Sequence, residues 1–449
     1  LTMVFSLIGI LMEQTFSKYI KNQIVWKKEQ NSFPLYIKFF EPKDYLFKYK
    51  VEFKPFVSTS DNFDISSMKK IEEAKPNIYF FVVETLRNDM INEDTMPNLT
   101  KFRADCTFTN GIANANATHH AWFSILNSVY PIYWNEYRER SSKLGSLPLR
   151  ILKNNDYKIN VFSSAHLDYF DYIHTIFGSK PIYDYFYENP ESSTSNRDIS
   201  AVSGLINFSN NINSGNLNLV WLDSTHHNYF LPEDFKLKFL PVTSSFDYTK
   251  TNYSQKEVVE IKNKYKNSLF FVDSLLGDFF NHLKNINQYD NSLIVIVGDH
   301  GEEFLEHGHL AHSSTLYSQQ INVSLNIKFP NKNIPNDENI SSVDIFPTIF
   351  SKIGYTDDYI NYLNGENSFL NHDIVVSGVS GLSTPKLFSL IFDNIKVIFT
   401  VNSNHLYIKE IIDKNTDNLL DYNEIIKIKD VIYEKLSKLE FIATLKEED

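Results

Sequence analysis

The chain contains very little cysteine: Cys106 is the only one among 449 residues. A single cysteine excludes an intrachain disulfide and any paired-cysteine zinc or redox motif. Long basic runs are also missing, and 55 acidic against 43 basic side chains give a formal net charge of −12. This acidic balance argues against nucleic acid as the main partner. The sequence shows no internal repeat and no low-complexity tract.

Apolar side chains, in contrast, are plentiful. They make up 42% of the chain, and aromatic residues make up 15%. This supply of material for a core excludes global disorder. A length of 449 residues is too great for one small core and suits one large α/β domain with an appendage, or two domains.

The first twelve residues, LTMVFSLIGILM, are almost wholly apolar, and charged residues follow from Glu13 onward. Twelve residues cannot span a bilayer, which needs about 20. The segment also lacks the basic start and the small-residue cleavage site of a signal peptide. We interpret residues 1–12 as the clipped end of a transmembrane helix and residues 13–75 as a juxtamembrane linker. A buried core helix is the alternative for residues 1–12.

Strands that are buried on both faces are predicted where apolar, β-branched and aromatic residues form continuous runs. Such runs occur at 77–83, 159–162, 217–222, 293–297 and 321–327. Between them, residues 254–283 carry apolar side chains three or four positions apart, as in an amphipathic helix. Strands that alternate with helices predict βαβ units. The predicted fold class is therefore α/β, with a mostly parallel sheet and helices on both faces.

A catalytic domain is predicted over residues 76–370, and a small C-terminal α+β part over residues 371–449. Strand candidates in the second part are 374–377, 387–392 and 395–400. The last two flank the tight turn Asp393-Asn394 and predict an antiparallel hairpin at the sheet edge. The charged tail after Thr416 is predicted to be helical.

Candidate chemical groups follow three of the predicted strands. Glu84 follows the first run, His226 follows the third, and Asp299 and His300 follow the fourth. In doubly wound sheets, functional groups gather just beyond the carboxyl ends of the strands. A set of carboxylates and imidazoles suits Zn²⁺ or Mn²⁺ better than Ca²⁺. The sequence thus predicts a metal site at this edge of the sheet.

Thr118 lies in a stretch of small residues that leads into a helix-like run. A hydroxyl at a helix N-terminus lies beside free backbone N–H groups and the positive end of the helix dipole, which suits an anion. The alternative is that Thr118 is only an N-cap, a common position for threonine.

Five motifs, in this order, resemble the sulfatase-like branch of the alkaline phosphatase superfamily. They are Glu84-Thr85-Leu86-Arg87-Asn88-Asp89, Met96-Pro97-Asn98-Leu99, residues 118–131, residues 223–229, and Gly298-Asp299-His300-Gly301-Glu302 with His312. Within the branch, the chain is most similar to membrane-tethered phosphoethanolamine and phosphoglycerol transferases. It is also similar to inner-membrane sulfatase-like proteins that bind cardiolipin and lipopolysaccharide. The resemblance covers residues 76–348 and implies an alkaline-phosphatase-like fold.

The resemblance also implies a metal site and a nucleophile. Glu84, Asp299 and His300 would hold one divalent metal, Zn or Mn, with Ca or Mg less expected. The Oγ atom of Thr118 would be a further ligand. Metal coordination lowers the pKa of a hydroxyl and makes it a nucleophile, so the resemblance implies a covalent phosphothreonine intermediate.

Three further residues would bind the substrate. His226 and His312 would contact its non-bridging oxygens or protonate the leaving group, since imidazole can do both near neutral pH. Arg87 would pair with a phosphate, or else form a structural ion pair with Asp89 or Glu84.

One departure from the family pattern narrows the expected reaction. Sulfatases oxidise a Cys or Ser to formylglycine within a C/S-x-P-S-R motif, and here Thr118 occupies that position, followed by His119-His120-Ala121-Trp122. Threonine cannot be converted to that aldehyde, and Cys106 lacks the motif. Sulfate-ester hydrolysis by the usual route is therefore not expected.

The sequence thus predicts a metal-dependent transferase or hydrolase that acts on phosphate esters and moves phospholipid head groups through Thr118. The expected substrate is a phospholipid or lipopolysaccharide. The chain would be anchored in the inner membrane, with its catalytic domain on the periplasmic side. A sulfatase-like lipid-binding regulator with little or no turnover is the alternative, and sulfuric ester hydrolysis ranks below both. A silent domain usually loses metal ligands, so the complete set here favours catalysis.

Overall fold

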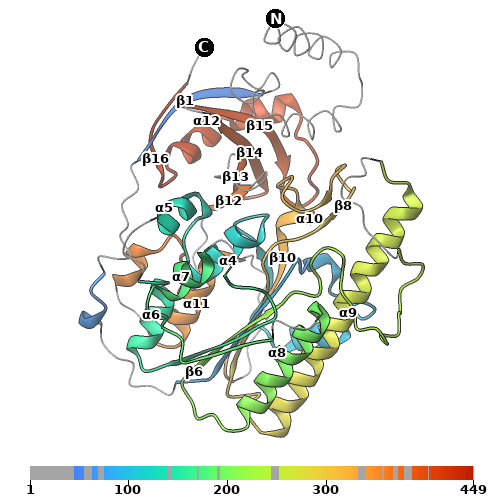
Figure 1. The fold of residues 1–449 in the computed structure, drawn as a ribbon. Coiled ribbons are helices and arrows are strands. Elements are labelled where there is room, and N and C mark those ends of the chain that lie inside the picture. Colours follow the sequence, from blue (N-terminus) through green and yellow to red (C-terminus); the bar gives the residue numbers. More distant parts are fainter. Residues whose placement is uncertain are drawn as a thin grey trace, which may run out of the picture.

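An eight-stranded, mostly parallel sheet forms the centre of the fold in this computed structural model (Figure 1). The structure describes residues 45–54, 63–68, 75–139, 144–168, 171–189, 193–243, 252–331, 340–355, 358–367, 373–378, 387–402 and 404–447. The strand order is β11-β3-β10-β7-β2-β6-β4-β5. Their bounds are β2 Ile78–Val83, β3 Phe108–Ile112, β4 Lys158–Ser163, β5 Tyr185–Glu188, β6 Asn216–Leu222, β7 Leu293–Gly298, β10 Asn322–Lys328 and β11 Ile340–Ser341.

The parallel core of this sheet runs from β7 through β2, β6 and β4 to β5. Only β10 runs against its neighbours, β3 and β7. Every residue of β2, β6 and β7 is buried. The predicted α/β fold, with a mostly parallel sheet covered on both faces, is confirmed.

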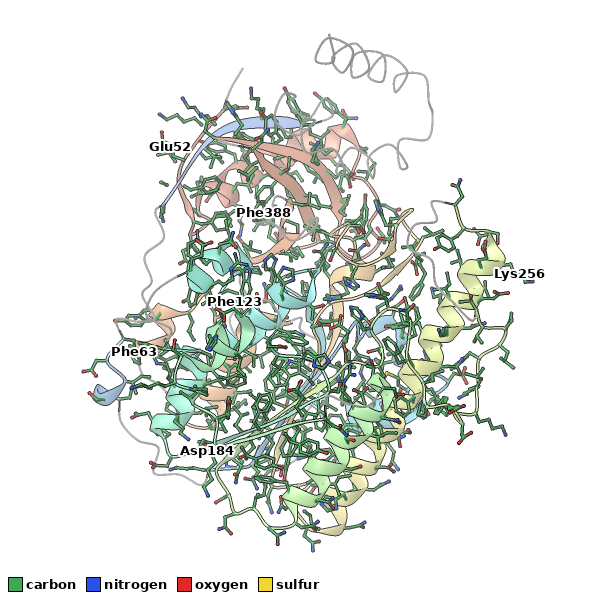
Figure 2. The ribbon with its side chains drawn as sticks, in the orientation of Figure 1. Glu52, Phe63, Phe123, Asp184, Lys256 and Phe388 are labelled. Atoms are coloured by element: carbon green, nitrogen blue, oxygen red, sulfur yellow. The ribbon has the colours of Figure 1, made fainter. Side chains whose placement is uncertain are left out.

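Helices cover the two faces of the sheet and create two hydrophobic cores (Figure 1). Successive residues of β2 point into opposite cores: Phe80 lies in one and Phe81 in the other. The first core contains Phe123 (Figure 2) and lies under α4 Thr118–Asn127, α5 Trp134–Glu139, α6 Leu147–Asn154, α7 Tyr172–Phe177 and α11 Ile345–Lys352. The second lies under α3 Pro97–Phe102, α8 Thr194–Ser209 and α9 Gln255–Asn285.

A second sheet of six strands has the order β12-β13-β14-β15-β1-β16, with every neighbouring pair antiparallel. The strands are β1 Phe47–Phe53, β12 Ile374–Gly378, β13 Leu387–Phe392, β14 Ile395–Asn402, β15 His405–Asp413 and β16 Ile442–Glu447, and helix α12 Tyr422–Ser437 packs against them. Phe388, labelled in Figure 2, belongs to the core of this sheet. The predicted hairpin is present as β13 and β14, but it lies inside this separate sheet and not at an edge.

Residues 13–75 were predicted to form a juxtamembrane linker, but the described part of this segment includes a strand. Its residues Phe47–Phe53 form β1, which pairs with β15 on one side and β16 on the other. Apolar and charged residues alternate in β1, and Tyr49 and Val51 are buried. Its partner strands lie more than 350 positions later in the sequence, so the local pattern could not reveal the pairing.

The remaining elements are short and connect the larger ones. They are η1 Ile65–Ser67, η2 Asn88–Met90, η3 Arg103–Asp105, η4 Pro131–Tyr133, η6 Ser342–Asp344, η7 Asp358–Tyr362, α10 Ser318–Ile321 and the two-stranded ribbon β8 Glu303–Phe304 with β9 Leu310–Ala311. Lys396 of the second sheet forms a buried ion pair of 2.8 Å with Asp417 and donates to Leu316 O, just before α10, at 3.1 Å. Asp417 also accepts a hydrogen bond from Ser318 N.

No helix in the described part of the chain is both long enough and apolar enough to cross a bilayer. The longest, α9, has 31 residues, but charged side chains such as Lys256, Glu260 and Lys262 recur along it. This finding contradicts the predicted inner-membrane localisation with a periplasmic catalytic domain. Residues 1–12, on which that prediction was based, lie outside the described residues.

Asp273 of α9 caps the N-terminus of α3. Its carboxylate accepts hydrogen bonds from Asn98 N at 2.9 Å and Leu99 N at 2.8 Å, whereas Met96, the N-cap residue, makes no side-chain cap. A Cβ atom at Gly277 would lie 2.6 Å from Cγ of Asn98, so a larger residue there would displace the Asn98 amide.

Replacing Asp273 with Ala should destabilise the fold by about 2 kcal/mol, because it leaves two backbone N–H groups without their acceptor. Chemical denaturation monitored by circular dichroism measures the change. Asp278→Ala is the matched control, since Asp278 is an exposed residue of the same helix. Equal stability of the two variants would show that the cap contributes nothing.

Candidate functional site

The register of the central sheet brings three carboxylates into one row. Val83, the last residue of β2, lies opposite Leu222 of β6 and Gly298 of β7. The residue that directly follows each of these strands is acidic: Asp223 follows β6, Glu84 follows β2 and Asp299 follows β7. Parallel strands end at the same edge, so these side chains meet there.

Glu84, Thr118, Asp299 and His300 lie together at this edge. Thr118 Oγ1 lies 3.1 Å from Glu84 Oε1 and 3.2 Å from His300 Nε2. His300 Nε2 lies 3.3 Å from Glu84 Oε1 and 3.7 Å from Asp299 Oδ2. Potential ligand atoms of Glu84, Asp299 and His300 all lie within 4.8 Å of one another, and the three side chains are buried. The structure thus brings together the four residues that were predicted to hold a metal.

The surrounding backbone fixes the orientation of these groups. Asp299 Oδ1 accepts hydrogen bonds from Thr85 N at 2.9 Å and His300 N at 2.8 Å. His300 Nδ1 donates to Gly301 O at 2.9 Å, so Nε2 is the ring nitrogen that faces the site. Thr85 has a φ of 52°, a strained value that its hydrogen bond to Thr225 O at 2.7 Å helps to hold.

The electrostatics of the site fit a divalent cation. Burial raises the pKa of Glu84 well above its usual value, and the nearby charges of Asp299 and Asp223 raise it further. Among the described residues, no group donates a hydrogen bond to Glu84 Oε2, which is buried. Buried carboxylates of like charge are costly unless a positive charge compensates them. The oxygen and nitrogen donors here match the ligands of a divalent metal.

His226 and His312 face the same centre. Glu84, His226 and His312 form a second group whose potential ligand atoms lie within 4.8 Å of one another. The ring of His312 lies 4.3 Å from that of His300 and 5.7 Å from that of His226. Burial lowers the pKa of His226 to about 2 and the pKa of His312 well below its usual value. Both imidazoles are therefore neutral near neutral pH.

Sequence reasoning assigned no role to Glu302, although it belongs to the Gly298–Glu302 motif. Its Oε1 lies 3.2 Å from His312 Nδ1, and its side chain is fully buried. Burial raises the pKa of Glu302 to about 8. Glu302 therefore holds the ring of His312 in place. In the sequence, only its position in the Gly298–Glu302 motif indicated that Glu302 belongs to the site.

Arg87 lies beside the site but is held by protein groups. Its guanidinium makes a bidentate pair with Asp89, at 2.8 and 2.7 Å, and an ion pair with Glu306 at 3.0 Å. It also donates to Glu302 O at 2.7 Å. These contacts fit the structural alternative considered for Arg87, an ion pair with Asp89, and not a free phosphate-binding group.

Thr118 is the first residue of α4, and Ala117 is its N-cap residue. The side chain of Thr118 makes its hydrogen bonds with Glu84 and His300, and the N-cap residue Ala117 makes no side-chain cap. The geometry therefore differs from the N-cap alternative. The helix instead delivers the hydroxyl to the candidate metal ligands.

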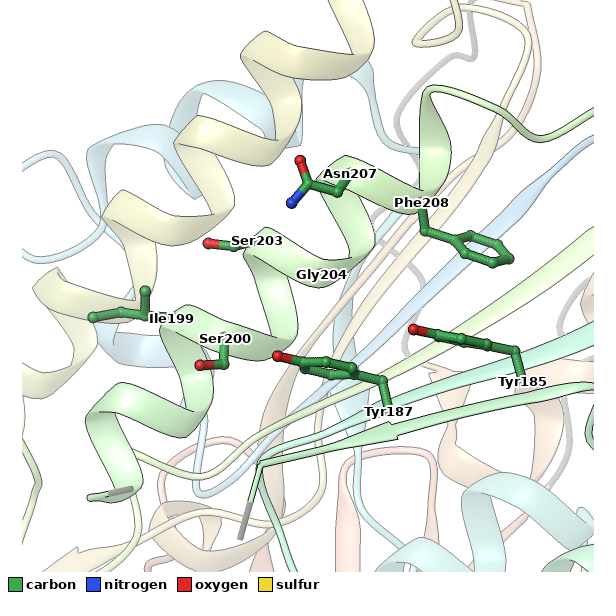
Figure 3. Close-up of a pocket in the computed structure, with 8 residues that line it drawn as sticks. All are labelled: Tyr185, Tyr187, Ile199, Ser200, Ser203, Gly204, Asn207 and Phe208. Carbon is green, nitrogen blue, oxygen red and sulfur yellow. The ribbon is translucent and has the colours of Figure 1, made fainter. Parts of the chain in front are cut away.

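A groove of about 420 Å³ lies away from this centre, between β5 and α8 (Figure 3). Tyr185 and Tyr187 project from the strand, and Ser200, Ser203 and Asn207 line it from the helix. It contains none of the predicted site residues, so we do not place the chemistry there.

Cys106 is fully buried and lies outside the candidate site. Its Sγ lies 3.5 Å from Phe102 O, and it packs in the second core. Burial raises the pKa of its thiol far above the usual range.

Comparison with known proteins gives a family match and structural relatives. The family model described as Sulfatase matches residues 76–355. An endo-4-O-sulfatase of Bacteroides thetaiotaomicron is 26% identical over 138 residues, which are 30% of this chain and 27% of that protein. The chain thus matches only about a quarter of that relative's length.

Two solved structures share the fold. A protein of the alkaline phosphatase superfamily from Vibrio parahaemolyticus superposes with a TM-score of 0.56 at 14% identity, over 91% of this chain and 93% of that one. The lipoteichoic acid synthase LtaP of Listeria monocytogenes superposes with a TM-score of 0.56 at 18% identity, over 85% and 95%. The predicted alkaline-phosphatase-like fold is therefore confirmed.

Replacing Asp299 with Asn should weaken divalent metal binding by more than about 100-fold, because it removes a charged ligand. Elemental analysis and chelator competition on the purified chain measure the change, with the exposed Asp278→Asn as control. A variant that retains the metal content of the wild type would exclude Asp299 as a ligand.

Cys106 should not react with iodoacetamide at pH 8 in the native protein, because the raised pKa keeps its thiol protonated. The unfolded chain, with a thiol pKa of about 8.5, should react. Stability from this thiol is fully present below the unfolded pKa and is lost as the pH rises above it.

Cys106→Ser should leave turnover nearly unchanged, and a complete loss of turnover would assign the cysteine a catalytic role.

Proposed function

The chain belongs to the Sulfatase family, and we propose that it is a metal-dependent enzyme that transfers or hydrolyses phosphate esters through Thr118. The observation that carries this proposal is the position of Thr118 Oγ1, 3.1 Å from Glu84 and 3.2 Å from His300. A hydroxyl held between candidate metal ligands at a helix N-terminus suits attack on an anionic ester.

Glu84, Asp299 and His300, with Thr118, would hold one divalent ion, and Zn²⁺ or Mn²⁺ suits this mixed donor set best. When bound, such an ion supplies positive charge that lowers the pKa of a hydroxyl and stabilises negative charge in the transition state.

The chain's own groups account for the other steps. Thr118 Oγ1 attacks phosphorus and its proton passes to Glu84 Oε1. The bond to the leaving alcohol breaks, the leaving oxygen takes up a proton from solvent, and a phosphothreonine forms that keeps the substrate's second ester group. Glu84 Oε1 accepts the hydrogen bond of the attacking hydroxyl. His226 and His312, as neutral imidazoles, donate N–H groups to the non-bridging oxygens. Water or an acceptor alcohol then attacks the phosphothreonine and releases Thr118.

The nucleophile supports phosphorus chemistry over sulfur chemistry. Threonine cannot become formylglycine, so the usual sulfatase route is closed even though the relative from B. thetaiotaomicron is a sulfatase. The motifs resemble those of phosphoethanolamine and phosphoglycerol transferases, which supports a phospholipid head group, or a related lipopolysaccharide group, as the proposed donor. The complete ligand set supports catalysis over the alternative of a lipid-binding regulator.

Replacing Thr118 with Ala should reduce phosphodiester turnover on the order of 10⁴-fold or more, because the nucleophile is removed. The assay uses bis(p-nitrophenyl) phosphate with Zn²⁺ or Mn²⁺. Thr118→Ser should retain turnover, and the exposed Thr444→Ala should match the wild type. Quenched wild-type reactions should yield, by mass spectrometry, a peptide whose Thr118 carries the p-nitrophenyl phosphoryl group of the substrate. Undiminished turnover in Thr118→Ala, with native circular dichroism, would exclude Thr118 as the nucleophile.

A further inference from the structure

The helix that carries Thr118 also contacts a candidate metal ligand directly. Trp122 lies one turn after Thr118 on α4, and its indole Nε1–H donates to Asp299 Oδ2 at 3.0 Å. Trp122 is 4% exposed. Residues four apart share one face of a helix, so the nucleophile and this donor approach the strand ends together.

The hydrogen bonds of Asp299 show what this contact does. Its Oδ1 accepts two backbone N–H groups, from Thr85 and His300. Its Oδ2 faces His300 Nε2 at 3.7 Å and accepts the indole N–H. With Oδ1 fully engaged, Oδ2 is the oxygen that retains a lone pair for a cation. Trp122 is the side-chain donor that fixes the direction of that oxygen.

We propose that Trp122 is a positioning residue of the metal site, whose N–H group orients Asp299 Oδ2 toward the ion. This inference rests on the proposed metal-dependent function. The C/S-x-P-S-R motif has an arginine where this chain has Trp122. The indole donates a hydrogen bond without adding a positive charge beside the cation. Groups that orient a ligand in this way typically account for 10–100-fold in metal affinity.

The chain offers a matched control in Trp221 of β6. Its ring lies 5.7 Å from that of Trp122 in the same core, and it is 1% exposed. Among the described residues, no group accepts a hydrogen bond from Trp221 Nε1. Replacing either tryptophan with phenylalanine therefore removes the same atoms from the same core, but only Trp122→Phe removes a hydrogen bond to Asp299.

The experiment measures Zn²⁺ affinity of the full chain by chelator competition, without substrate, for wild type, Trp122→Phe, Trp221→Phe and Asp299→Asn. We expect Trp122→Phe to bind Zn²⁺ about 10-fold more weakly or worse, and Trp221→Phe to match the wild type. With Co²⁺ in place of Zn²⁺, the visible absorption bands should change in Trp122→Phe and stay the same in Trp221→Phe, because they report ligand geometry.

Wild-type affinity in Trp122→Phe would overturn the inference, and so would equal weakening in both phenylalanine variants, which would indicate packing alone. Asp299→Asn separates this failure from that of the metal site itself. If it loses Zn²⁺ while Trp122→Phe does not, only the role of Trp122 fails. If it retains Zn²⁺, the proposed metal site fails as well.

If a variant does not fold, the inference can still be tested on the wild-type chain. With ¹⁵N-labelled tryptophan, Zn²⁺ should shift the Nε1–H resonance of Trp122 more than that of Trp221. The absence of such a shift would overturn the inference.

Discussion

Glu84 and Asp299 lie buried side by side because β2 and β7 are adjacent parallel strands that end in register. Asp223 extends the row at the end of β6. Three carboxylates in so small a volume repel one another, and burial removes the water that would screen them. The pKa of Glu84, which burial raises and the charges of Asp299 and Asp223 raise further, expresses that cost. A bound cation resolves it, which is why the edge of this sheet points to a metalloenzyme.

Helix α4, the segment after β7 and the second sheet position the other groups of the site around these three carboxylates. Helix α4 delivers Thr118 to Glu84 and His300, and one turn later it delivers the indole of Trp122 to Asp299. The segment after β7 folds back so that His312 lies at the same centre, where Glu302 orients its ring. The second sheet anchors the end of that segment through Asp417 and Ser318. The C-terminal part therefore supports the geometry of a site to which it contributes no ligand among the described residues.

Much of this could be read from local sequence. The strands that carry Glu84, Asp299 and His226 are continuous apolar runs, and the residue after a buried parallel strand lies at the functional edge. Contacts between distant segments could not be read in this way. The pairing of β1 with β15 and β16, the cap that Asp273 gives to α3, and the bond from Trp122 to Asp299 each join residues far apart in the chain. The membrane localisation was inferred from a short apolar segment and from the resemblance to membrane-tethered proteins, and the helices of the described part of the chain contradict it.

The central claim is that Glu84, Asp299, His300 and Thr118 hold one divalent metal. A crystal structure of the Zn²⁺-loaded chain, with anomalous data at the zinc edge, tests it most directly. The account predicts one anomalous peak about 2.0–2.2 Å from the carboxylate oxygens of Glu84 and Asp299 and from His300 Nε2, with Thr118 Oγ1 as the fourth neighbour. The absence of a peak there, or a single peak bound instead by Glu84, His226 and His312, would contradict it.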